Sequence, residues 1–241
     1  MALPTEINPF VKTCPLCGTS SHAFACEPRD DDSKRRLRNL KLPGGDPGRN
    51  ETCPACGSNS TERLLYLYLL HYTEVFNPTA RRLRVLALCE LPRLTEAIGN
   101  VSRIELAHEF SATMFDVVVE DSMLERADDD RKTLALLRDQ LSPGGLLVLS
   151  EAVSPVLPAT LEDAGIETER QRRRAYGSPA RKRVFGADFG ERITAAGLVF
   201  ESFDRRTDRG RFGGWRNRFA LAAGRTLTIC RREADAYEPL S

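Results

Sequence analysis

Two copies of one cysteine knuckle constrain this chain more than any other feature. Cys14 and Cys17 lie in CPLCG, and Cys53 and Cys56 lie in CPACG. The two-residue spacing lets both thiolates of a knuckle reach one metal ion, and the following glycine permits the positive φ angle that such a turn often needs. Four thiolates suit a tetrahedral zinc ion with a closed, structural coordination sphere. Iron in the same geometry, a redox dithiol and two chance pairs are the alternatives.

The remaining cysteines and the ends of the chain indicate the compartment. Cys26, Cys89 and Cys230 lack the knuckle spacing, and the last two lie in apolar runs that resemble core strands. The first residues show no basic and then apolar signal pattern, and no apolar run approaches the ~20 residues that span a bilayer. We therefore expect a soluble, cytoplasmic protein without membrane contact, in which paired cysteines are metal ligands rather than disulfides.

The segment between the knuckles, residues 27–51, alternates acidic and basic blocks and then becomes rich in glycine and proline. This pattern favours an exposed loop over a packed element. The basic cluster at 34–38 suits contact with phosphate, but the acidic residues 30–32 cancel most of its field. A solvated loop is the preferred interpretation.

After the second knuckle the chain alternates helices and strands. A helix is expected from Ser60 or Thr61 to Asn77, where Pro78 follows, because leucines and tyrosines recur at helical spacing. Strands are expected at 84–90, 102–107, 115–121, 146–152, 198–203 and within 219–232, and helices at 92–98, 128–141 and 185–197. Apolar strands separated by amphipathic helices predict an α/β fold with a mainly parallel sheet, and the last two strands predict an antiparallel C-terminal hairpin.

Three blocks of sequence carry a resemblance to a known family. FDVVVEDSMLERADDDRKTLALLRDQLSPGGLLVLS, residues 115–150, resembles the fourth strand, following helix and fifth strand of class I S-adenosylmethionine (SAM)-dependent methyltransferases. The second knuckle with residues 57–94, and residues 176–198, resemble a bacterial subgroup that carries an N-terminal zinc-ribbon-like CPxCG pair. The resemblance covers about 13–232. It implies a zinc-ribbon-like domain at 1–60, a Rossmann-like methyltransferase domain at 61–234 and a tail at 235–241.

The cofactor region departs from the family pattern in two ways. LALCELPRL stands where the first strand of the family ends in a glycine-rich turn that lets the backbone approach the cofactor. The segment from Arg84 to Asp121 has only 38 residues, so the second and third strands must be reduced. The resemblance implies that Glu90 faces the amino group of SAM and that Glu105, at the end of its strand, bonds the ribose. The implied cofactor residues are Cys89, Glu90, Glu105, Asp121 and Met123.

Two functions remain open on the sequence. In the first, the protein transfers a methyl group from SAM to an unidentified acceptor by proximity and orientation, and no catalytic residue is assigned. In the second, the fold is a noncatalytic binding or scaffolding module for a partner protein. A homo-oligomer is a further alternative for the partner.

A basic bias and an aromatic loop are the remaining clues to a substrate. Residues 165–218 hold fourteen Lys or Arg against seven Asp or Glu. This bias suits RNA, a nucleotide-linked substrate or an acidic partner, although a solvated surface is favoured over nucleic acid. The loop 206–218 is expected to display Phe212 and Trp215, which would stack on a flat ligand or cover the sheet edge.

Overall fold

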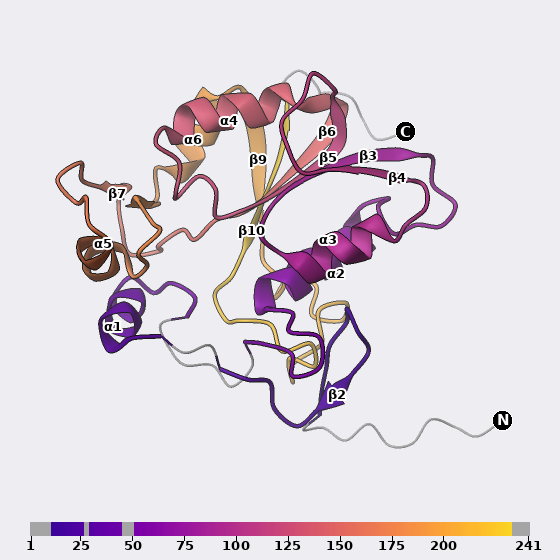
Figure 1. Cartoon of the computed structure of the whole chain (residues 1–241), viewed down its shortest axis with the longest axis horizontal. Helices are drawn as coiled ribbons and strands as arrows, with labels where there is room; N and C mark the ends of the chain where they lie inside the picture. Colours follow the sequence, from indigo (N-terminus) through magenta and orange to yellow (C-terminus); the bar gives the residue numbers. More distant parts are fainter. Residues whose placement is uncertain (1–10, 27–28, 45–50, 233–241) are drawn as a thin grey trace.

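A six-stranded sheet forms the centre of the molecule (Figure 1). The computed structural model describes residues 11–26, 29–44 and 51–232. The strands are β3 (Leu83–Leu88), β4 (Ile104–Ala107), β5 (Phe115–Asp121), β6 (Leu141–Ser150), β9 (Leu198–Phe203) and β10 (Leu227–Arg232). Their order is β4-β3-β5-β6-β10-β9, with the first four parallel and β10 antiparallel to both neighbours. The prediction of an α/β, Rossmann-like, mainly parallel sheet with an antiparallel C-terminal hairpin is confirmed.

One side of the sheet is shortened. The classic doubly wound order, 3-2-1-4-5-6, has two strands beyond the first. In the described residues, only β4 lies beyond β3. β4 has four residues, and the exposed segment 108–114 reaches β5 without forming a further strand or helix. The predicted reduction of this half of the sheet is confirmed.

Helices cover both faces of the sheet (Figure 1). Leucines of α2 and α3 pack on one face with Val117 and Val119, whereas leucines of α4 and aromatic or aliphatic residues of α6 pack on the other face with Val118. Alternate residues of a strand point to opposite faces, so β5 is apolar on both. No helix in the described ranges is long and apolar enough to cross a membrane. The four helices are α2 (Ser60–Tyr72), α3 (Pro92–Gly99), α4 (Asp130–Asp139) and α6 (Phe189–Ala195).

The prediction that residues 27–51 form an exposed loop is wrong for the part that the structure describes. Residues Asp31–Asn39 form helix α1, which Asp30 caps by accepting a hydrogen bond from the backbone N–H of Ser33. α1 lies beside α5 (Glu169–Tyr176), as Figure 1 shows. Leu37 is 3% exposed and joins the apolar cluster of Tyr176. Burial of that leucine, not the surrounding charge, decides the structure of this segment.

Short strand pairs complete the fold. β1 (Lys12–Thr13) pairs with β2 (Ser20–Ser21) around the first knuckle, and β7 (Leu161–Glu162) pairs with β8 (Arg183–Val184) next to α5. The proposed tail at 235–241 lies outside the described residues.

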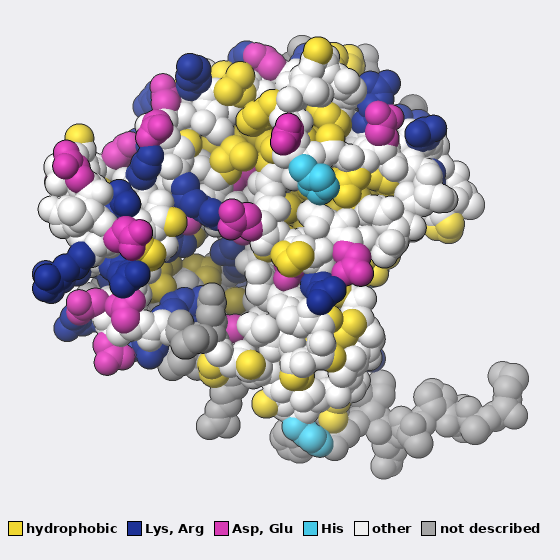
Figure 2. All heavy atoms as spheres, viewed as in Figure 1, with side chains coloured by type: hydrophobic (Ala, Val, Ile, Leu, Met, Phe, Trp, Pro, Cys, Tyr) yellow, Lys and Arg dark blue, Asp and Glu magenta, His cyan; other side chains and the backbone are white. Residues whose placement is uncertain are grey.

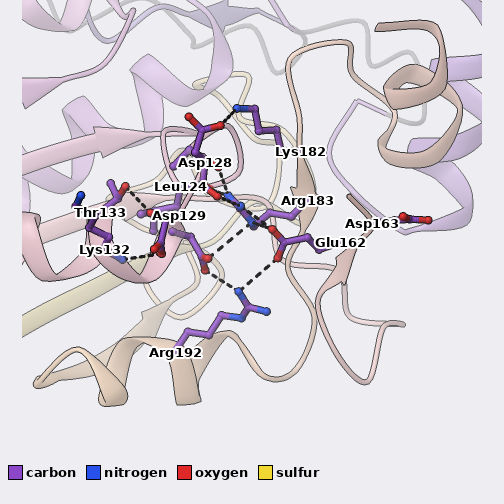
Figure 3. Close-up of polar contacts among 12 residues, drawn as sticks. Leu124, Asp128, Asp129, Lys132, Thr133, Glu162, Asp163, Lys182, Arg183 and Arg192 are labelled. Carbon is purple, nitrogen blue, oxygen red and sulfur yellow. Dashed lines mark hydrogen bonds and ion pairs between the residues drawn. The ribbon is translucent and has the colours of Figure 1, made fainter. Parts of the chain in front are cut away.

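A buried arginine fastens the turn after β5 to the rest of the core (Figure 3). Arg183 is fully buried and donates to the carbonyl oxygens of Leu124 at 2.5 Å and Ala127 at 2.7 Å. Its Nη2 also lies 2.7 Å from a carboxylate oxygen of Glu162. Arg183 therefore holds the turn by hydrogen bonds to backbone carbonyl oxygens that have no access to water in the interior.

Replacement of Arg183 by methionine should destabilise the protein. The change keeps much of the side-chain volume but leaves buried carbonyl oxygens without donors, so we expect a loss of roughly 3 kcal/mol. Urea unfolding followed by circular dichroism measures this loss. Arg131→Met, on the exposed side of α4, is the matched control, and equal stability of the two variants would contradict the role assigned to Arg183.

Candidate functional site

The four knuckle cysteines meet at one point. The Sγ atoms of Cys14 and Cys56 are 3.7 Å apart, and those of Cys17 and Cys53 are 3.8 Å apart. All four sulfur atoms lie within 4.8 Å of one another. Zinc–sulfur bonds of about 2.3 Å in a regular tetrahedron place the sulfurs about 3.8 Å apart. The donor set therefore fits a single tetrahedral metal ion.

The two knuckles have the same backbone geometry. Gly18 and Gly57 have φ angles of +74° and +76°, and each donates its N–H to the carbonyl oxygen of the first cysteine in its knuckle. Only glycine adopts this left-handed region at little cost. The Ser58 hydroxyl lies 3.2 Å from the sulfur of Cys14 and 3.3 Å from that of Cys56. These contacts orient the thiolates around the metal position.

Two adjacent charged residues, Glu62 and Arg63, join the knuckles to the sheet domain. Glu62 is 2% exposed, and its carboxylate accepts from the backbone N–H of Asn59 at 2.7 Å and of Arg93 at 2.8 Å. Asn59 in turn caps α2, one residue before the expected cap. One carboxylate therefore holds the starts of both α2 and α3.

Arg63 makes the corresponding contacts to carbonyl groups. It is fully buried and donates to the carbonyl oxygens of Ser58 at 2.5 Å, Phe219 at 3.0 Å and Ala220 at 2.7 Å. Its guanidinium also lies 4.8 Å from the ring centroid of Phe24. One side chain thus contacts the residue that follows the second knuckle, the segment after the first knuckle and the C-terminal loop.

A cavity of about 510 Å³ opens at the carboxyl end of β3 and β5. Four of the predicted cofactor residues line it: Cys89, Glu90, Asp121 and Met123. This is the edge at which open α/β sheets bind their ligands. The other lining residues are Ala87, Leu88, His108, Arg126 and Ala127. Residues that are distant in sequence therefore converge on one concave site.

The charged groups of this cavity are of both signs. Glu90 is exposed, and its carboxylate lies 3.8 Å from the guanidinium of Arg126. Asp121 pairs with Arg225 at 3.1 Å. The Nδ1 atom of His108 lies 3.4 Å from the carbonyl oxygen of Ala87. Burial raises the pKa of the Cys89 thiol to about 12, so this side chain is neutral and acts as a small apolar wall.

Glu105 does not join the other predicted residues. It is the second residue of β4 and pairs in register with Arg84 near the start of β3, so the expectation that it ends its strand is wrong. It lines a separate cavity with Arg81 and Asp116. The position at the carboxyl end of β4 belongs to Ala107 and His108.

The two aromatic residues of the C-terminal loop have different environments. Phe212 is completely buried against the rings of Tyr72 and Phe203, so the expectation that the loop displays it is wrong. Trp215 is 84% exposed, and the guanidinium of Arg209 lies 3.5 Å from its ring centroid. Of these two residues, Trp215 alone is available for stacking on a ligand, because Phe212 is packed in the core against α2.

Two buried carboxyl groups support the floor of the cavity. Glu120 accepts from the backbone N–H of Met123, and Glu151 accepts from that of Leu124 at 2.8 Å. Burial raises the pKa of Glu120 to about 8. Burial and the neighbouring Glu120 charge raise the pKa of Glu151 well above its usual range. Both groups therefore favour the protonated form, although the second oxygen of each is buried without a hydrogen-bond partner among the described residues.

Sequence reasoning missed several residues of this region. Glu62 and Arg63 looked like ordinary polar positions of a helix start, although the apolar residues on every side of that helix indicate full burial. Glu120 follows three valines in an apolar strand, which was a signal that its carboxyl is buried. Arg126 gave no local signal, because its position depends on the turn after β5.

Comparison with solved structures finds methyltransferases. The glycopeptide N-methyltransferase MtfA with S-adenosylhomocysteine is 15% identical, with a TM-score of 0.43 and coverage of 85% of this chain and 99% of that chain. A chain of the complex between the Haloferax volcanii Trm112 methyltransferase activator and a methyltransferase is 13% identical, with a TM-score of 0.40 and coverage of 86% and 99%. For an O-methyltransferase family protein from Burkholderia thailandensis the identity is 15% and the TM-score 0.35, and the match covers 62% of this chain and 43% of that chain. No family profile and no curated protein matches the chain.

Replacement of Cys53 by serine should release the metal. We expect the zinc content, measured by plasma mass spectrometry, to fall from one ion per chain towards none. A loss of about 2 to 3 kcal/mol should lower Tm by roughly 5 to 10 °C, because the metal contributes directly to folding. Cys26→Ser, at an exposed cysteine outside the cluster, is the control. Full zinc content in the Cys53 variant would refute a shared four-cysteine site.

The buried carboxyl pair predicts a pH dependence of stability. Because the folded pKa values lie above the unfolded value near 4.5, the native state holds protons that the unfolded state releases, and stability falls as the pH rises from about 5 to 8. Glu151→Gln mimics the protonated group and should flatten this fall, with a gain of about 1 kcal/mol at pH 8. Urea unfolding at four pH values tests this, with the exposed Glu191→Gln on α6 as control. An unchanged slope would contradict the raised pKa of Glu151.

Proposed function

We propose that the protein is a SAM-dependent methyltransferase whose cofactor binds in the 510 Å³ cavity at the carboxyl end of β3 and β5. The observation that carries this proposal is the convergence of Cys89, Glu90, Asp121 and Met123 on that one cavity. Its position agrees with the rule for ligand sites in open α/β sheets. The volume is in the range of sites that enclose a small organic ligand.

The chemistry of the lining fits SAM. Glu90 and Arg126 provide a carboxylate and a guanidinium at the same cavity, which complement the ammonium and carboxylate groups of the methionine moiety. Leu88, Met123 and Ala127 provide apolar contacts suited to the adenine ring. Side-chain contacts replace the glycine-rich turn, which this chain lacks.

The residues of the chain contribute mainly by binding and orientation. When bound, SAM supplies a sulfonium methyl group that an acceptor nucleophile takes while the electrons of the carbon–sulfur bond remain on sulfur. Arg225 orients the Asp121 carboxylate at 3.1 Å, and the buried carboxyl pair holds the following turn. Such fixed geometry accelerates transfer through proximity, and no general base is assigned.

We further propose that zinc occupies the four-cysteine cluster and has a structural role. Four thiolates complete its coordination, so no position is left for a substrate. Zinc would hold the two knuckles together beside Arg63, whose contacts to the carbonyl groups of Ser58 and Ala220 attach them to the sheet domain.

Calorimetric titration of the zinc-loaded protein with S-adenosylhomocysteine and with SAM tests the cofactor site. We expect micromolar binding, and Glu90→Gln should weaken it about tenfold because one charge-assisted contact is lost. Glu191→Gln, on the exposed surface of α6, should bind as the unchanged protein does. No binding at millimolar ligand would reject the methyltransferase function and leave the scaffolding alternative.

A further inference from the structure

A second cavity, of about 750 Å³, adjoins the proposed cofactor cavity. It lies between the second knuckle, α1, α5 and the carboxyl end of β5. Figure 2 shows the molecule hollowed in this region, left of centre, with dark blue Lys and Arg and magenta Asp and Glu side chains around the hollow. Asp121 lines both cavities. A ligand in this cleft would therefore lie next to the cofactor site.

Four arginines from separate segments line the cleft. Arg29 precedes α1, Arg173 is on α5, Arg181 precedes β8, and Arg225 precedes β10. Each guanidinium has five N–H donors in a planar fork, a geometry that matches phosphate oxygens. Convergence of four such groups on one concave surface is a recognition pattern for anions.

The acidic groups of the cleft are already engaged within the protein. Glu51 accepts from Arg29 at 3.0 Å, and Asp121 pairs with Arg225 at 3.1 Å. Asp30 caps α1 through the backbone N–H of Ser33 at 2.9 Å. Arg173 and Arg181 also pair, with Glu169 at 3.8 Å and Glu125 at 2.8 Å. A carboxylate occupies only part of a guanidinium fork. Donor capacity therefore remains for an incoming anion.

Two helices begin at the cleft. Asp30 and Ser33 of the α1 start and Asn59, Ser60 and Thr61 of the α2 start are among its lining residues. Their dipoles add little to the field of the arginines, because Asp30–Asp32 and Glu62 lie at the two helix starts. Hydroxyl and amide groups at the same places suit a ligand that is rich in hydroxyl groups.

We propose that this cleft binds the methyl acceptor and that the acceptor is a phosphate-bearing small molecule of nucleotide size. This inference rests on the proposed methyltransferase function, because only that function makes the neighbour of the cofactor an acceptor. The four arginines select phosphate, and the volume of about 750 Å³ suits a nucleotide rather than a lone anion. A concave lining drawn from several separate segments favours a small molecule over an RNA chain.

Calorimetric titration with uridine diphosphate, inorganic pyrophosphate and uridine tests the cleft on the zinc-loaded protein without SAM. We expect the diphosphate and pyrophosphate to bind and uridine to bind at least tenfold more weakly. Affinity should also fall with added salt, because the contacts are charged. Binding of a short RNA without binding of either phosphate compound, or no binding at millimolar concentrations, would overturn the inference.

Arg173→Ala is the matched variant for this test. Its side chain is exposed and lies 3.8 Å from Glu169, so its removal should leave the fold intact, which circular dichroism verifies. We expect uridine diphosphate to bind about tenfold more weakly to it, whereas Arg170→Ala, on the exposed surface of the same helix and outside the lining, should bind normally. Equal affinity of the two variants would overturn the inference.

Titration with S-adenosylhomocysteine separates the two proposals. Phosphate binding that is lost in the Arg173 variant, together with normal S-adenosylhomocysteine binding in that variant, supports both. S-adenosylhomocysteine binding without phosphate binding overturns the inference and leaves the proposed function standing. Phosphate binding without S-adenosylhomocysteine binding rejects the proposed function and the acceptor role of the cleft.

Discussion

The contacts of Glu62 and Arg63 are the constraint on which the arrangement of this molecule depends. Both side chains are buried at the start of α2 and carry opposite charges. A charged group removed from water is tolerated only when its hydrogen-bonding capacity is met. The Glu62 carboxylate accepts hydrogen bonds from backbone N–H groups at the starts of α2 and α3. The Arg63 guanidinium donates to carbonyl oxygens next to the second knuckle and in the C-terminal loop. The knuckles, both helices and that loop therefore hold one relative position, and a change at either residue would leave the other groups unpaired.

The same contacts alter the cofactor region. In doubly wound folds, the helix after the first strand offers its N-terminal N–H groups to a ligand. Here Glu62 occupies that position, since it accepts from the N–H groups of Arg93 at 2.8 Å and of Leu94 at 3.4 Å. A glycine-rich turn has no ligand to approach when a protein carboxylate already caps the helix. Because the Glu62 carboxylate caps α3, the CELP turn needs no glycine to let a ligand approach that helix. In the proposed complex, Glu90 and Arg126 make the polar contacts to SAM instead.

The sequence predicts those features that depend on local pattern. The knuckle spacing, the apolar strands and the closing hairpin are each encoded within a few residues, and the structure confirms the fold that they imply. Features that depend on distant partners were missed. Leu37 and Leu40 are isolated apolar residues in a highly charged run, and they are buried because distant residues, Tyr176 among them, complete their cluster. Glu105 was placed at the wrong end of its strand because β4 is short and the preceding turn extends to residue 103. Phe212 lies in a loop whose glycines suggested exposure, although three aromatic rings receive it.

The turn after β5 connects the two cavities, and buried polar groups fix its backbone conformation. Ser122 has a φ angle of +59°, in the left-handed region that is uncommon for residues other than glycine. Such a conformation persists only when surrounding contacts determine it. Glu120 and Glu151 bind the next two backbone N–H groups, and Arg183 binds the carbonyl oxygen of Leu124 from the other side. Asp121 precedes this fixed point and lines both cavities. In the proposed function, methyl transfer by proximity requires two ligands at a defined separation, and a turn held in this way is suited to set that separation.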